Sequence, residues 1–334
     1  MYFFNVISLL GGLSLFLYGM RLMGNSLKEG QSGTLKVIMG KVTDNPVKAF
    51  LLGVLVTAVI QSSTATIVIT SGLVAAGIIS LNQSLGIIVG ANVGTTVTGQ
   101  IIRLLDVQSD ASFFLRLFQP STLAPLALIL GIILIMFFKF KKSDNLGNIA
   151  IGFGILFTGL LNMTAAVSGL KESGIIDALF LGLGNKPVLG YIVGAGVAFT
   201  LQSSSATIGI LQAISMAGDI PFKVAYVIIV GVYLGDCVTT AIVCSIGAKS
   251  DSKRVGIVNI MYNLAKTILV IVVVFAIHKF GMLDNLWDMR MTSGTIANTN
   301  TIFNIACAII MLPFMKLLGN SSRKIIKDKV TPEG

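Results

Sequence analysis

Two long segments of this chain contain no charged side chain, and the same short polar sequence interrupts both of them. Residues 49–102 and 188–218 hold no Asp, Glu, Lys or Arg. Inside them, QSSTATIVI at 61–69 returns as QSSSATIGI at 202–210, at an offset of 141 residues. Because a membrane-spanning helix needs only about 20 apolar residues, each segment can hold more than one membrane element. The pattern predicts a chain that folds in a lipid bilayer around two polar breaks.

The composition agrees with this class. Hydrophobic residues make up 54% of the chain and charged residues 11%, whereas about a quarter of the residues are charged in a typical soluble domain. We therefore expect an all-α integral membrane protein. The net charge of +10 does not indicate a nucleic-acid partner, because the basic residues lie in short connectors and in the C-terminal segment. Since cytoplasmic loops are enriched in Lys and Arg, we expect a multi-pass protein of the cell membrane with its N-terminus outside and its C-terminus in the cytoplasm.

Seven helices are expected to cross the membrane, with a re-entrant hairpin at each QSS sequence. The hairpins cover 47–80 and 187–220, and their arms are too short to cross a bilayer alone. If each QSS segment were instead a single span, the two halves would be parallel, and the distribution of basic residues does not choose between these models. We favour hairpins, which make two inverted-topology repeats.

The expected spans are 3–20, 82–105, 119–138, 146–170, 224–247, 255–278 and 296–315. The expected domains are repeat 1 at 1–141, repeat 2 at 142–279, an extracellular loop with the final helix at 280–318, and a basic cytoplasmic tail at 319–334.

The repeat extends beyond the QSS sequences, which makes a chance match improbable. At the same offset, Pro46 matches Pro187 and IIVG at 87–90 matches IIVG at 228–231. A bundle whose Gly and Ser residues only let helices pack closely would show some of these features. Gln61 and Gln202 disfavour that interpretation, because an amide in hydrocarbon is costly unless hydrogen-bond partners satisfy it.

A helix that stops at Gln-Ser-Ser inside the membrane exposes the first backbone N–H groups of the next half-helix. These groups and the Ser and Thr hydroxyls form a cradle suited to an anion. Each half-helix N-terminus carries about half a positive charge, so two of them offer about one, against an oxyanion that carries one or two. A cation would make up the difference, and Thr, Ser, Asn and carbonyl oxygens are suitable ligands for Na⁺. The residues therefore predict an oxyanion site coupled to sodium.

Further motifs resemble a known family. GANVGTT at 90–96 follows the first hairpin, NTIFNI lies at 300–305, and YNL at 262–264 looks like a second copy of that Phe-Asn element. With the two QSS[ST] motifs, the chain resembles the type II sodium-dependent phosphate cotransporters, as a bacterial member. The resemblance implies that phosphate binds Gln61, Ser62, Ser63, Thr64, Gln202, Ser203, Ser204 and Ser205. It implies that Na⁺ binds among Thr66, Thr207, Asn92, Thr95, Thr96 and Asn304.

Two departures from the family pattern stand out. The second repeat reads GVYLGDC at 231–237, so Tyr233 and Asp236 stand where the pattern has Asn and Thr. Lys266 lies in the middle of an expected span, where a charge normally needs a partner and a purpose. We expect Lys266 to pair with Asp236, so that the ammonium replaces a bound Na⁺ or the carboxylate carries a proton. The alternative is that Lys266 snorkels or only ties two helices together.

The predicted function is sodium-coupled symport of inorganic phosphate by alternating access. The alternatives are a sodium- or proton-coupled transporter of another oxyanion such as sulfate, or a phosphate-sensing scaffold or channel. We expect no enzyme, because a serine hydrolase built on Ser62 or Ser203 needs a base and the lone His278 lies at a helix end. No organic cofactor is expected. The resemblance implies a cytoplasmic PhoU-like regulatory domain or partner, and a homodimer is left open.

Overall fold

The computed structural model describes residues 2–29, 45–106, 117–138, 140, 142–172, 174–184, 186–246 and 249–327. Within these ranges the secondary structure is helical, apart from an isolated β-bridge between Pro221 and Arg290. The first half contains α1 (Tyr2–Glu29), α3 (Pro46–Ile60), α4 (Ser63–Ala75), α5 (Leu81–Gly94), α6 (Thr96–Ile102), η1 (Arg103–Asp106) and α8 (Pro120–Phe137). The second half contains α9 (Ser143–Lys171), α10 (Ile175–Gly184), α11 (Pro187–Leu201), α12 (Ser204–Ala217), α13 (Phe222–Ser245) and α14 (Ser250–Lys279). The chain continues through α15 (Asp284–Trp287), α16 (Ser293–Met311), η2 (Leu312–Phe314) and α17 (Met315–Ile325).

Within the described part of the chain, seven helical stretches are long and apolar enough to cross a membrane. This confirms the predicted all-α membrane fold. The stretches agree with the expected spans in order and position, and two of them run further than expected. The first continues to Glu29, and the last, which joins α16, η2 and α17, continues to Ile325. Both extensions carry basic residues in their last turn. These residues interrupt the apolar pattern in the sequence, but the helix continues through them.

Each QSS sequence joins two short helices into a hairpin, as predicted. The first hairpin consists of α3 and α4, with 15 and 13 residues, and the second of α11 and α12, with 15 and 14 residues. At a rise of about 1.5 Å per residue, each arm spans roughly 20 Å, which is less than the ~30 Å of a bilayer core. The arms therefore end inside the apolar layer, where their termini need polar partners.

The helix bounds repeat with the sequence offset. Adding 141 to the bounds of α3 gives 187–201, which are the bounds of α11. The same shift takes α4 to 204–216, and α12 is Ser204–Ala217. It also takes α1 to 143–170, and α9 is Ser143–Lys171. The sequence repeat is thus a repeat of local structure.

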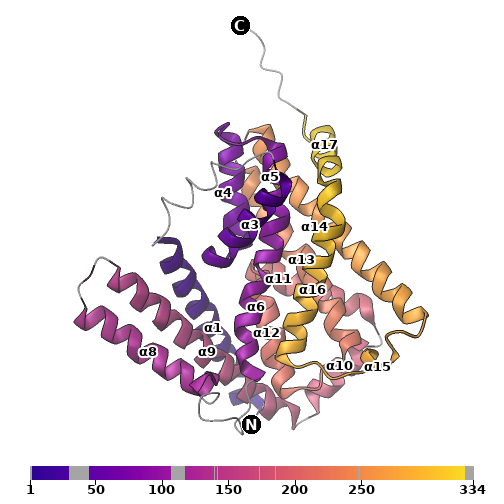
Figure 1. Cartoon of the computed structure of the whole chain (residues 1–334). Coiled ribbons are helices and arrows are strands. Elements are labelled where there is room, and N and C mark those ends of the chain that lie inside the picture. The colour runs from indigo at the N-terminus through magenta and orange to yellow at the C-terminus, as the bar shows by residue number, and fades with distance from the viewer. Residues whose placement is uncertain are drawn as a thin grey trace.

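The two hairpins approach the centre of the molecule from opposite ends. Three of the crossing stretches in the described chain lie between them, namely Leu81–Asp106, Pro120–Phe137 and Ser143–Lys171. An odd number of crossings brings the chain to the other membrane face before the second hairpin begins. Figure 1 shows α3, α4 and α17 in the upper half of the molecule and α12 in the lower half.

Close backbone packing holds the first arm of each hairpin against the crossing helix that follows it. A Cβ on Gly90 of α5 would collide with the carbonyl oxygen of Phe50 in α3. The equivalent Gly231 of α13 faces the carbonyl oxygen of Tyr191 in α11 in the same way. Only glycine permits this approach, and it fixes the depth at which each hairpin ends.

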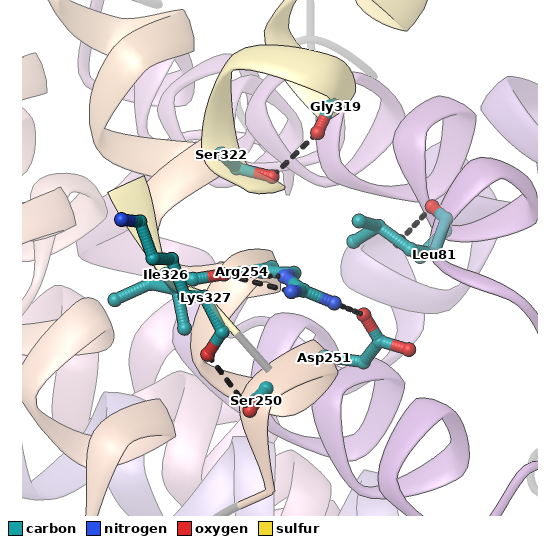
Figure 2. Close-up of polar contacts among 9 residues, drawn as sticks. Leu81, Ser250, Asp251, Arg254, Gly319, Ser322, Ile326 and Lys327 are labelled. Atoms are coloured by element: carbon teal, nitrogen blue, oxygen red, sulfur yellow. Dashed lines mark hydrogen bonds and ion pairs between the residues drawn. The ribbon is translucent and has the colours of Figure 1, made fainter. Parts of the chain in front are cut away.

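The C-terminal helix is anchored to the start of α14. Arg254 is 4% exposed and donates from Nε and Nη2 to the carbonyl oxygen of Ile326, at 3.0 and 2.7 Å. Asp251 pairs with the same guanidinium at 2.5 Å, and Ser250 donates to the carbonyl oxygen of Lys327 (Figure 2). These contacts satisfy the carbonyl groups of the two residues that follow α17.

Candidate functional site

The helix breaks are built by two glutamines in a left-handed conformation. Gln61 closes α3 with φ 59° and ψ 26°, and Gln202 closes α11 with φ 52° and ψ 35°. They are the only non-glycine residues with positive φ among the described residues. A glycine is usual at such a position, because a side chain there is strained. Strain at the same place in both repeats makes the two breaks candidates for a functional site.

Serine starts the second half-helix of each hairpin. Ser62 accepts a hydrogen bond from the N–H of Ala65 at 3.1 Å, and Ser203 accepts one from the N–H of Ala206 at 3.2 Å. These N-caps satisfy one donor in each first turn. The N–H groups of the two residues that follow each capping serine precede the first intrahelical bonds, so they take no partner within the helix.

The two hairpin tips meet at one carboxylate. Ser63 of α4 donates to Oδ2 of Asp236 at 3.4 Å, and Ser204 of α12 donates to the same oxygen at 3.0 Å. Ser63 and Ser204 are equivalent residues of the two repeats, and Asp236 lies on α13. The other carboxylate oxygen, Oδ1, is buried and has no hydrogen-bond partner among the described residues. A carboxylate oxygen therefore lies between the N-termini of α4 and α12.

Lys266 and Asp236 do not form the direct ion pair that the sequence suggested. The ammonium donates instead to Oδ1 of Asn92 at 3.1 Å and to Oδ1 of Asn304 at 3.0 Å. It also lies 3.8 Å from the centre of the Tyr233 ring. Tyr233 lies one turn before Asp236 on α13. Its ring contacts the ammonium of Lys266, whereas the Asp236 carboxylate accepts hydrogen bonds from Ser63 and Ser204.

These groups surround a small central cavity. Its volume is about 20 Å³, which is room for roughly one water molecule or one ion. Ser63 and Ser204 reach it from the hairpin tips, and Asp236 and Lys266 reach it from α13 and α14. The full lining is Ser63, Asn92, Thr95, Ser204, Ile208, Val232, Tyr233, Asp236, Asn263, Lys266, Asn300 and Asn304.

The other predicted phosphate residues do not line this cavity. Gln61 accepts from the Thr98 hydroxyl at 2.7 Å and donates to the carbonyl oxygen of Ala58 at 2.6 Å. The side chain of Gln202, in contrast, is exposed. Thr64 shares a hydrogen bond with Thr240 at 2.9 Å. Ser205 is buried beside Ser203, with 3.3 Å between the hydroxyl oxygens.

The predicted sodium residues fall into two groups. Asn92, Thr95 and Asn304 line the cavity, and the ammonium of Lys266 already engages both amides. Thr66, Thr207 and Thr96 lie outside the lining. Their hydroxyls donate to carbonyl oxygens three or four residues earlier in the chain, at 3.1 Å to Ser62, 2.9 Å to Ser203 and 2.8 Å to Val93.

Sequence reasoning did not assign Asn263 and Asn300 to the site, although both line the cavity. Asn300 lies one helical turn before Asn304, and Asn263 lies three residues before Lys266. Polar side chains at spacings of three and four share one face of a helix. Scanning the expected spans for such a polar face would have found both residues. Tyr233, noted only as a departure, is the aromatic wall of the cavity.

Comparison with known proteins places this geometry in a family. A family model described as Na⁺/Pi-cotransporter matches residues 15–165 and again 170–316. Over 325 residues the chain is 24% identical to YjbB of Salmonella typhimurium, whose name describes an inorganic phosphate exporter. This match covers 97% of the chain and 56% of that protein, so the chain spans about half the length of that relative.

Two further relatives are informative. The uncharacterized protein YqeW of Bacillus subtilis is 26% identical over 305 residues, covering 90% of this chain and 92% of that protein. The human sodium-dependent phosphate transport protein 2B is 31% identical over 120 residues, covering 35% and 17% of the two chains. No solved structure matches the chain significantly. Because the family model matches most of the chain in two consecutive copies, the chain belongs to the Na⁺/Pi-cotransporter family.

Proposed function

We propose that the chain moves inorganic phosphate across the membrane, coupled to Na⁺, with the anion held between the two hairpin tips. One observation carries this proposal: the equivalent serines Ser63 and Ser204 both donate to the same acidic oxygen of Asp236. Donors from two half-helix N-termini that already hold a carboxylate oxygen suit the oxygens of a tetrahedral anion.

Phosphate entry requires the tips to separate. The cavity of about 20 Å³ holds a water-sized species, so in this arrangement the site is too small for a phosphate ion. Separation of the tips would free the hydroxyls of Ser63 and Ser204 for the anion. Relative movement of the two repeats about a fixed central site is the form of alternating access that their inverted arrangement allows.

Sodium has a suitable position beside the anion. Oδ1 of Asp236 lacks a hydrogen-bond partner among the described residues, and the hydroxyl of Thr95 lines the same cavity. Carboxylate and hydroxyl oxygens are hard ligands of the kind that bind Na⁺. A cation at this position would neutralise the carboxylate and allow an anion to approach it, which couples the two ions.

The test is uptake of radiolabelled phosphate into proteoliposomes, with and without an inward Na⁺ gradient. We expect Ser63→Ala with Ser204→Ala to lower gradient-driven uptake by at least tenfold, because each lost hydrogen bond to a charged group costs about 1.5–3 kcal/mol. The matched control is Ser215→Ala, since Ser215 is buried in α12 and, among the described residues, its hydroxyl bonds only to the carbonyl oxygen of Gln212 in its own helix.

The outcomes separate the alternatives. Uptake that the control variant retains and the double variant loses supports phosphate transport at the tips. Inhibition by excess sulfate as strong as by unlabelled phosphate would point to a general oxyanion carrier. Phosphate binding without accumulation would overturn coupled transport in favour of a sensor or channel.

A further inference from the structure

We propose that Lys266 is a tethered cation, whose ammonium occupies one cation position of the transport site in place of an exchangeable Na⁺. This inference rests on the proposed transport function and specifies its ion requirement. It differs from a simple structural ion pair, because the ammonium is held by neutral oxygens and not by a carboxylate.

The ammonium lies in a position built for a cation. Lys266 is 1% exposed, and its two acceptors come from different helices, Asn92 on α5 and Asn304 on α16. The ring of Tyr233 closes a third side, with its centre 3.8 Å from Nζ. A π-face and two amide oxygens are a favourable surrounding for a desolvated positive charge.

The surrounding contacts fix both amide oxygens toward this position. Asn92 donates through Nδ2 to the carbonyl oxygen of Ile88 at 3.0 Å and to Oδ1 of Asn259 at 3.3 Å. Asn304 donates through Nδ2 to Asn300 and to the hydroxyl of Tyr233, at 2.8–3.2 Å. Because the N–H₂ group of each amide donates to these neighbours, its oxygen must face the ammonium. Removing the ammonium would therefore leave oriented oxygens, which is the requirement for an ion site.

The charges of the site leave room for one more cation. Two half-helix N-termini contribute about +1, Lys266 adds one positive charge and Asp236 one negative charge. A phosphate dianion then needs about one further positive charge, which a single Na⁺ supplies. Without the ammonium, two would be needed.

The ammonium also has capacity for the anion itself. Of its three N–H groups, two reach Asn92 and Asn304, and the third has no acceptor among the described residues. Since Lys266 lines the same cavity as Ser63 and Ser204, this donor is available to an oxygen of the bound anion. A cation that the chain carries with it takes no energy from the Na⁺ gradient, so the exchange of one Na⁺ for Lys266 weakens coupling.

Two substitutions test the proposal. Lys266→Ala removes the ammonium and opens its position between Asn92 and Asn304, whereas Lys266→Met removes the charge but keeps most of the volume. In the purified protein, we expect added Na⁺, compared with choline, to raise the melting temperature of Lys266→Ala by more than that of the original chain. Lys266→Met should show no such gain. In proteoliposomes, the Na⁺ Hill coefficient of phosphate uptake by Lys266→Ala should rise by about one.

The controls locate the gained Na⁺. Adding Asn92→Ala to Lys266→Ala should abolish the gained stabilisation, and Lys171→Gln, which breaks the surface pair with Asp219, should leave the response to Na⁺ unchanged. A folded Lys266→Ala protein that responds to Na⁺ as the original chain does would overturn the proposal. So would an equal gain in Lys266→Met. Because stabilisation by Na⁺ is measured without phosphate, failure of transport alone would count against the proposed function and not against the tethered cation.

Discussion

At the scale of single residues, the most unusual feature is the pair of glutamines in left-handed conformation. Gln61 has neighbours that hold it, since its amide bonds both Thr98 and Ala58. Gln202 has the same backbone conformation, but its side chain is exposed and has no hydrogen bond to a described residue. The two equivalent breaks are thus equally strained but unequally supported, which makes the second tip the easier one to move.

Glycine at the two positions should therefore have opposite effects. We expect Gln202→Gly to leave stability unchanged or raise it by up to about 1 kcal/mol, because glycine adopts positive φ without steric strain. Gln61→Gly should lower stability by about 1 kcal/mol, because it also removes two hydrogen bonds. Thermal unfolding of both variants in detergent measures the difference. Equal shifts for the two would show that the support of Gln61 contributes nothing.

At the scale of elements, contact between α11 and α13 sets where the second hairpin ends. Gly231 of α13 lies against the backbone of α11. A Cβ added to Gly231 would collide with the carbonyl oxygen of Tyr191 and would lie 3.0 Å from the backbone nitrogen of Ala195. The first repeat uses Gly90 against α3 for the same purpose. A shift of either contact would move a QSS tip away from the central cavity.

We expect Gly231→Ala to destabilise the protein by about 3 kcal/mol, because a rigid backbone carbonyl cannot yield to the added methyl group. Gly196→Ala, in α11 of the same hairpin, is the matched control. A Cβ there meets nothing within 4 Å, and alanine in a helix interior is favoured over glycine by up to about 1 kcal/mol. The melting temperatures of the two variants should change in opposite directions. A Gly231→Ala protein as stable as the original would show that the helices separate readily.

At the scale of the whole molecule, the site exists because two inverted halves bring equivalent residues to one point. Ser63 and Ser204 are far apart in sequence, yet both bond Oδ2 of Asp236. The start of α14 lies against the end of α17, at the top of the molecule in Figure 1, and α15 lies in its lower part. The sequence-based expectation of a cytoplasmic C-terminal segment predicts that the start of α14 faces the cytoplasm and that α15 faces outward.

Accessibility of single cysteines in intact cells checks this orientation. In a background without Cys237, Cys244 and Cys307, all of which are buried, a membrane-impermeant thiol reagent should label Asn285→Cys but not Lys249→Cys. Both positions are exposed in the structure. After the cells are permeabilised, both should react. Labelling of Lys249→Cys alone in intact cells would reverse the proposed orientation.

Much of the site could be predicted from the sequence, because its components are local. The QSS breaks, the GANVGTT element and the Phe-Asn motif led to Ser63, Ser204, Asn92, Thr95 and Asn304, all of which line the cavity. The partner of Lys266 could not be predicted in this way. A charge in a membrane span calls for a partner, and opposite charge suggested Asp236, but the position of the Tyr233 ring and the orientation of two amides depend on how three helices pack.

By itself, the sequence determined the membrane class, the crossing helices, the two hairpins and the repeat. These follow from the lengths of apolar segments and from the requirement that every backbone group in a bilayer has a partner, and both are properties of contiguous residues. Only the tertiary structure decided which side chains meet at the centre. Asp236 accepts from both tips and Lys266 rests on two asparagines because helices remote in sequence cross there, and a contact between them depends on packing that no local pattern records.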